Sequence, residues 1–234
     1  MVGSMEYVEI ARAESERGEL VLRERHENGA PTVLELRANG VFVMDSQETS
    51  TEQALADAAL ELVDQPRDVL VAGLGLGYTM HRVLADQRVE RCSVVEIEPE
   101  LLEWMRDGTV PHGPAMLADK RANPVVADIS TAIGEVADAS YDLVLLDVDN
   151  GPDHLVHQHN AELYREPFLT ELRRILRPGG AVAIWSAEVS PELETVLEQV
   201  FGNAETRGRD VTLQGRDEKY WLHVARVGAV ASDG

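Results

Sequence analysis

The chain has 234 residues and carries 42 acidic side chains against 21 basic ones, for a formal net charge of −21. Such a surface repels phosphate backbones and anionic lipids, so we expect no nucleic-acid partner and no membrane partner. No apolar run approaches the roughly 18 residues that a membrane span needs, and the N-terminal residues do not resemble a secretory signal. The single cysteine, Cys92, excludes an internal disulfide and fits a cytoplasmic location.

Residues 6 to about 46 alternate apolar and polar side chains, which is the pattern of half-buried β-strands. Turn signals in the stretches ERGE, ENGAP and ANG divide this segment into four strands, near 6–13, 19–26, 32–37 and 41–45. Strands joined by such short turns form hairpins. We therefore expect residues 1–48 to form a small N-terminal β-hairpin domain.

The pattern changes at Ser50, where a capping-box sequence begins a helix that runs to about Val63 and ends before Pro66. From Asp68 onward, apolar strands alternate with helices, which is typical of a parallel sheet with right-handed crossovers. The expected strands are 68–72, 91–97, 124–127, 141–147, 180–186, 205–213 and 219–226, and the expected helices are 77–87, 99–106, 130–137, 160–176 and 191–201.

The last two expected strands are joined only by a turn around Gly215, so they should pair as an antiparallel hairpin at one edge of the sheet. The sequence therefore predicts an α/β fold: a Rossmann-like, seven-stranded, mostly parallel sheet over residues 49–227, with an antiparallel edge hairpin. Residues 228–234 are small and polar, and we expect them to form a flexible tail.

Gly73, Gly75 and Gly77 follow the first strand of the α/β region and open its first helix. Glycine lets backbone N–H groups approach a ligand closely, and a helix N-terminus adds a positive dipole. A tight turn from strand to helix also favours glycine, so this motif alone does not identify a ligand.

Carboxylates stand at the ends of the next three strands. Glu96, about 20 residues past the glycines, is placed to accept hydrogen bonds from two ribose hydroxyls. Asp128 is placed to accept a bond from the exocyclic amine of a base or, alternatively, to cap the following helix. Asp147 ends the fourth strand. Ile129 can cover a ring face and Ile97 follows Glu96, so these residues together predict a nucleoside site.

From Arg17 to about Arg226, the chain resembles the spermidine synthase-like branch of the class I S-adenosylmethionine-dependent transferases. The glycine loop, Glu96, Asp128, Asp147 and the closing stretch LRPGGAVAIWS occur in that family's order and spacing. The resemblance implies that the three glycines face the methionine part of the cofactor, Glu96 the ribose and Asp128 the adenine amine. It also implies that the N-terminal hairpins pack beside the active site and support a homodimer.

The residues at the positions that bind the substrate in this family differ from the family's pattern. Aminopropyltransferases have an aspartate inside the glycine loop that holds the ammonium of decarboxylated S-adenosylmethionine, and this position is Leu76 here. Their Tyr-His-Glu cluster is replaced by the stretch TEQALA at 51–56. An acid close to the carboxylate of the ordinary cofactor would be unfavourable, so its loss favours S-adenosyl-L-methionine.

We therefore predict a transferase that is a small-molecule methyltransferase acting on an amine or hydroxyl. Two alternatives stay open: a polyamine aminopropyltransferase that uses decarboxylated S-adenosylmethionine, and a non-catalytic nucleoside-binding module.

Transfer from a sulfonium needs an aligned nucleophile that has lost its proton. Asp147 fits as orienting group and general base, with Asp149 or His154 in support, and its carboxylate can also hold the cofactor ammonium. We assign Asn150, His154 and Tyr164 to the acceptor, although Tyr164 fits a packing role equally. Asp149, Asn150 and His154 could also hold a divalent metal, but their spacing matches no tight ligand signature, so we expect no metal.

Overall fold

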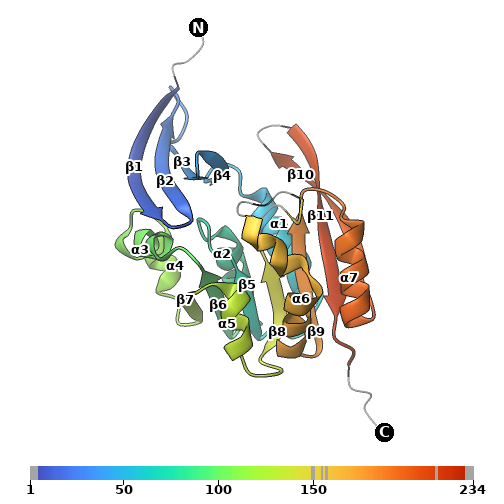
Figure 1. Cartoon of the computed structure of the whole chain (residues 1–234). Helices are drawn as coiled ribbons and strands as arrows, with labels where there is room; N and C mark the ends of the chain where they lie inside the picture. The colour runs from blue at the N-terminus through green and yellow to red at the C-terminus, as the bar shows by residue number, and fades with distance from the viewer. Residues whose placement is uncertain (1–4, 149–150, 154, 156–157, 214–215, 230–234) are drawn as a thin grey trace.

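The computed structural model describes residues 5–148, 151–153, 155, 158–213 and 216–229 of the chain (Figure 1). Its N-terminal part is a four-stranded antiparallel sheet in the order β1-β2-β3-β4. Short turns join these strands, so each pairs with the next one along the chain. The strands are β1 (Glu6–Ser15), β2 (Gly18–His26), β3 (Val33–Ala38) and β4 (Val41–Asp45).

The larger sheet has seven strands in the order β10-β11-β9-β8-β5-β6-β7. Strand β5 pairs in parallel with β6 on one side and with β8 on the other, so the strand order reverses between β5 and β8. Strand β11 runs antiparallel to both β9 and β10. This arrangement confirms the predicted fold. The strands are β5 (Asp68–Ala72), β6 (Arg91–Glu96), β7 (Ala122–Val126), β8 (Tyr141–Leu146), β9 (Leu176–Ser186), β10 (Glu205–Leu213) and β11 (Arg216–Arg226).

One of the expected helices is interrupted. The segment expected to be helical from 160 to 176 is a 3-10 helix followed by an α-helix, and extended backbone at Arg165 separates them. Pro167, in the first turn of the second helix, has no N–H to donate to the preceding turn. The helices are α1 (Ser50–Leu60), α2 (Tyr78–Ala85), α3 (Pro99–Asp107), α4 (Gly113–Leu117), α5 (Ile129–Ala132), η1 (Ile133–Glu135), η2 (Gln158–Tyr164), α6 (Glu166–Ile175) and α7 (Pro191–Phe201).

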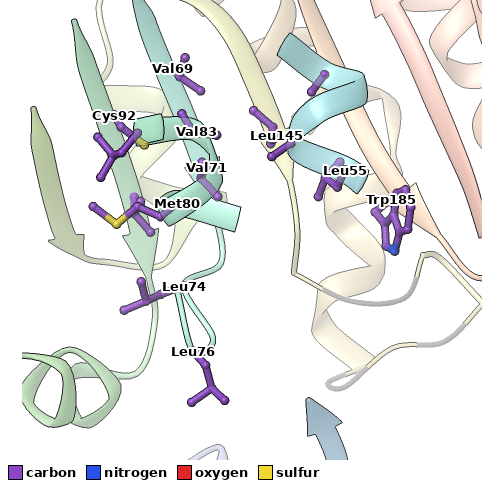
Figure 2. Close-up of a cluster of buried hydrophobic side chains, with 14 of the residues drawn as sticks. Leu55, Val69, Val71, Leu74, Leu76, Met80, Val83, Cys92, Leu145 and Trp185 are labelled. Atoms are coloured by element: carbon purple, nitrogen blue, oxygen red, sulfur yellow. The ribbon is translucent and has the colours of Figure 1, made fainter. Parts of the chain in front are cut away.

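The two faces of the larger sheet carry separate hydrophobic clusters. Side chains alternate along each strand, so Val69 and Val71 of β5 point into one cluster while Leu70 and Ala72 point into the other. Helices α1, α2 and α3 cover the first cluster, part of which is drawn in Figure 2, and α6 and α7 cover the second.

The N-terminal sheet packs into the first of these clusters. Leu22, Leu36 and Met44 are buried together with side chains of α1, β5 and β8. In Figure 1 this sheet lies beyond the carboxyl ends of β5 and β6, with the β1–β2 hairpin beside α3. The domain boundary at residue 48 and the cytoplasmic location remain proposals, and residues 230–234 of the expected tail lie outside the described residues. Across the described residues, we find no helix with the length and apolar character that crossing a membrane requires.

Candidate functional site

A cavity of about 530 Å³ opens where the strand order reverses, at the carboxyl ends of β5, β6 and β8. This is the position at which open α/β sheets bind ligands. The N-terminal sheet contributes Leu36, Phe42 and Met44 to the wall that faces the strand ends. The cavity is therefore enclosed between the two sheets, and both are needed to form it.

The loop after β5 depends on glycine at two positions for different reasons. Gly73 has a φ of +97°, and a Cβ there would lie 2.1 Å from the backbone oxygen of Asp147. Gly77 has a φ of +84°, and a Cβ there would lie 2.5 Å from the methyl group of Met116. Gly73 and Gly75 line the cavity, whereas Gly77 lies outside its lining. Gly77 therefore allows α2 to begin against the core, which differs from the expected contact with the cofactor.

Glu96 ends β6 and organises the rim of the cavity. Its Oε2 accepts a hydrogen bond from the Leu74 N–H at 3.0 Å, and its Oε1 accepts one from the Glu98 N–H at 2.8 Å. Burial raises the pKa of this carboxyl above its ordinary value. The side chain lines the cavity and can still accept bonds from ribose hydroxyls, since each carboxylate oxygen has a second lone pair.

If Glu96 holds the ribose as expected, replacing it by alanine should weaken the binding of 5′-methylthioadenosine by about 1–3 kcal/mol, because the N–H groups of Leu74 and Glu98 and the ribose hydroxyls would lose their acceptor. Isothermal titration calorimetry measures the change. Glu103→Ala, an exposed acid on α3, is the matched control. Unchanged affinity in Glu96→Ala would remove this residue from the nucleoside site.

Asp128 has the capping role that the sequence left open, and it also lines the cavity. Its Oδ1 accepts bonds from the Ser130 N–H at 2.9 Å and from the Ser130 hydroxyl at 2.7 Å, which caps α5. The same residue lines the cavity together with Ile97 and Ile129. These three residues lie on the same side of the cavity as Glu96, in the place expected for the base. Their contact with adenine remains a proposal.

Asp147 follows β8, on the other side of the glycine loop. Its Oδ2 accepts a hydrogen bond from the Thr79 hydroxyl at 2.6 Å. Burial raises the pKa of Asp147 to about 6, although the bond from Thr79 acts in the opposite direction. Such a carboxylate is ionised at neutral pH and is still basic enough to take up a proton.

Glu52, in the first turn of α1, lines the cavity and was not assigned to the site by the sequence analysis. Its pKa is raised to about 7, first by burial and then by the negative charge of Asp147. Burial and the charge of Glu52 in turn raise the pKa of Tyr78, which also lines the cavity. Glu52 and Asp147 are thus close enough to interact, although α1 precedes the first strand of the larger sheet and Asp147 follows its fourth strand along the chain.

The remaining expected substrate residues divide into two groups. Asp149, Asn150 and His154 lie outside the described residues. Tyr164 is only 6% exposed, packs in the second hydrophobic cluster and is not among the residues that line the cavity. This position fits the packing role that the sequence left open. His159 and Asn160 from the same 3-10 helix line the cavity in its place. No group of His, Cys, Asp and Glu among the described residues could hold a metal ion.

Comparison with known proteins extends this picture. The family described as the spermine/spermidine synthase domain matches residues 36–213 of the chain. The chain belongs to this family. The matched segment includes β4, the glycine loop and all the carboxylates that line the cavity between Glu52 and Asp147.

Two relatives of this chain have names that agree with the family. A protein from Pseudomonas aeruginosa named polyamine aminopropyltransferase 2 is 33% identical over 150 residues, which are 62% of this chain and 41% of the relative. A polyamine aminopropyltransferase from Saccharolobus solfataricus is 28% identical over 151 residues, which are 62% of this chain and 49% of the relative. The chain thus spans about half the length of the curated relatives that it matches.

Two solved structures of spermidine synthases share the fold. One, in complex with the transition-state analogue AdoDATO, has a TM-score of 0.77 and 17% sequence identity. The match covers 95% of this chain and 74% of the spermidine synthase chain. The other, from Thermotoga maritima, has a TM-score of 0.74 and 16% sequence identity. The match covers 96% of this chain and 74% of the Thermotoga chain. At these identities, the likeness shows the fold alone.

These findings contradict the prediction of a small-molecule methyltransferase, because the relatives are named polyamine aminopropyltransferases. The predicted S-adenosyl-L-methionine cofactor also loses its support. The physical error lies in the interpretation of Leu76. Its side chain is fully buried in the first cluster (Figure 2) and is not among the residues lining the cavity. The glycine loop supplies no carboxyl group to the cavity, but Glu52 of α1 does.

Proposed function

We propose that this chain transfers an aminopropyl group from decarboxylated S-adenosylmethionine to a small amine. The observation that carries the proposal is the pair of carboxyl groups from Glu52 and Asp147 in one cavity with the nucleoside-binding features around Glu96 and Asp128. Both substrates of such a reaction carry ammonium groups, and two acids at the same end of the cavity favour cations there.

The charges around the cavity favour the decarboxylated cofactor over the ordinary one. Among the described residues that line the cavity, the arginine is Arg17. It forms an ion pair with Glu98, beside the residues proposed to bind the nucleoside. His159 is 70% exposed and lies 3.9 Å from the carboxylate of Glu162. No other described lining residue carries a basic side chain. The carboxylate of S-adenosyl-L-methionine would therefore face Glu52 and Asp147 without a cationic partner, whereas the ammonium of the decarboxylated form would be attracted.

The reaction would proceed as a direct displacement. The bond between the sulfonium sulfur and the aminopropyl carbon breaks, with its electron pair staying on sulfur, and a new bond forms from that carbon to the acceptor nitrogen. The nitrogen gives up one proton, and methylthioadenosine leaves as a neutral thioether. We assign Asp147 the task of orienting the acceptor amine and taking up this proton. Glu52 would hold the amine next to it.

The direct test supplies the purified protein with decarboxylated S-adenosylmethionine and a panel of monoamines, diamines and triamines. Mass spectrometry follows methylthioadenosine and the acceptor with one added aminopropyl group. A parallel series contains S-adenosyl-L-methionine. We expect product in the first series only. S-adenosylhomocysteine with a methylated acceptor, or cofactor binding without any transfer in either series, would contradict the proposal.

The acceptor is accordingly proposed to be an amine, and the protein is proposed to act as a homodimer. Strand β1 supports the second part, because Tyr7, Val8 and Ile10 are exposed apolar side chains along this edge strand. An uncovered edge of this kind favours pairing with another copy.

A further inference from the structure

The turn between β1 and β2 holds Arg17 in a defined position. The side chain of Asn39, from the turn between β3 and β4, donates to the backbone oxygen of Arg17 at 3.1 Å. The same side chain accepts a bond from the Glu19 N–H at 3.0 Å. The Arg17 N–H donates to the Ser15 hydroxyl at 3.1 Å. The backbone that carries Arg17 is thus fixed by two neighbouring turns of the N-terminal sheet.

The guanidinium of Arg17 reaches across to the larger sheet, to residues about 80 positions later in the chain. Its Nε donates to Oε1 of Glu98 at 2.6 Å and its Nη2 donates to Oε2 of Glu98 at 2.9 Å. Nη2 also donates to the backbone oxygen of Ile97 at 3.2 Å. This is the bidentate geometry in which arginine and carboxylate bind most specifically. The Glu98 side chain is 8% exposed and that of Arg17 is 35% exposed.

The segment that Arg17 holds is part of the rim of the cavity. Arg17, Ile97 and Glu98 all line the cavity, next to Glu96. The backbone N–H of Glu98 donates to Glu96, so a shift of Glu98 would move the carboxylate assigned to the ribose. A continuous series of hydrogen bonds therefore runs from Asn39 through Arg17 and Glu98 to Glu96.

Attachment of the N-terminal sheet does not depend on this ion pair. Leu22, Leu36 and Met44 already bury the sheet in the hydrophobic cluster that it shares with α1 and β5. Buried ion pairs add little net stability, because desolvation offsets most of the attraction between the charges. The bidentate contact has its specific effect in fixing the geometry of the segment that it holds.

We propose that Arg17 is a positioning residue for the nucleoside half of the substrate: it fixes Ile97 and Glu98 so that Glu96 and the rim keep the shape that receives the adenosyl group. The proposal rests on the proposed function only in that the cavity binds an adenosyl compound. Arg17 does not contact the reacting atoms, so it acts on binding and not on the transfer step.

The test is a double-mutant cycle with Arg17→Met, Glu98→Gln and the double variant, and with 5′-methylthioadenosine as the probe in calorimetry. We expect the dissociation constant to rise roughly ten-fold in Arg17→Met, as for a lost charged hydrogen-bond pair. Thermal unfolding should show a loss of stability in Arg17→Met, because the carboxylate of Glu98 is left buried without its partner. In the double variant, stability should recover while the affinity stays low. Arg12→Met, an exposed arginine on β1, is the matched control.

Kinetics provide a second measurement. With decarboxylated S-adenosylmethionine, Arg17→Met should raise the KM for this substrate and leave kcat and the KM for the amine unchanged. A dissociation constant in Arg17→Met equal to that of the wild type, or an affinity that recovers together with stability in the double variant, would overturn the inference. A wild-type protein that binds methylthioadenosine with the expected dependence on Arg17, but transfers nothing, would contradict the proposed function and leave this inference intact.

Discussion

Replacing Asp147 by asparagine should reduce turnover with decarboxylated S-adenosylmethionine by about 10²–10⁴-fold, which is the usual loss when a general base is removed. The amide keeps the shape of the side chain, and its oxygen can still accept the bond from the Thr79 hydroxyl. The charge and the basicity are lost. Binding of 5′-methylthioadenosine should change much less, because the nucleoside contacts Glu96 and Asp128 in the proposed arrangement.

Single-turnover kinetics and calorimetry separate these two effects. Asp153→Asn is the matched control, because Asp153 is an exposed acid in the loop that follows Asp147. If Asp147→Asn retained wild-type turnover, the base would have to be another group, and the proposed reaction centre would be misplaced. If nucleoside binding fell as far as turnover, Asp147 would be a binding residue instead.

Replacing Glu52 by glutamine should lower kcat/KM for the acceptor amine by about 10–100-fold, since the ammonium group of this substrate loses a charged partner. The pH profile gives a sharper result. Asp147 ionises with a pKa of about 6, and its charge then helps to raise the pKa of Glu52 to about 7. Activity that needs both carboxylates should therefore rise with pH in two steps, near 6 and near 7. Glu52→Gln should abolish the upper step and keep the lower one.

The stability of the protein should change with pH in the opposite direction. Both pKa values are raised above the ordinary values of 3.8 for Asp147 and 4.5 for Glu52, so the folded state favours the protonated carboxyl groups. Their contribution to the free energy of unfolding is fully present below the unfolded pKa values, near pH 4, and is lost as pH rises through about 6 and 7. Glu52→Gln should reduce this loss when urea unfolding is measured at pH 5 and pH 8.

Asp57→Asn, an exposed substitution on the same helix, is the control for both measurements on Glu52. A profile of Glu52→Gln with the same two steps as the wild type would show that Glu52 does not titrate with the active site. The electrostatic reason for preferring the decarboxylated cofactor would then rest on Asp147 alone.

The strand pattern and the carboxylates at the strand ends could be predicted from the sequence because each depends on local order. Short continuous apolar runs identify β5 and β8, and Glu96 and Asp128 stand at or just after the ends of their strands. Glu52 could not be found in this way. Its importance depends on the packing of α1 against β8, which brings the first turn of α1 next to Asp147.

Leu76 shows a different limit of sequence reasoning. Its position inside the glycine loop indicated a missing acid, but the direction of a side chain in such a loop depends on the backbone around it. Gly75 and Gly77 have φ values of +51° and +84°, and His112 contacts the backbone oxygen of Leu76 at 2.6 Å. With this backbone, the leucine side chain is buried in the core, and the cavity acquires its acid from α1.

The hydrophobic cluster that the N-terminal sheet shares with α1, β5 and β8 has a consequence for how the chain folds. Leu22 and Leu36 are buried in the same cluster of side chains as Leu55 and Val71, so separating the two parts would expose apolar surface on both. We therefore expect the two regions, which differ in architecture and divide near residue 48 in sequence, to unfold as a single cooperative unit. The proposed boundary would then separate two patterns of secondary structure and not two independently stable bodies.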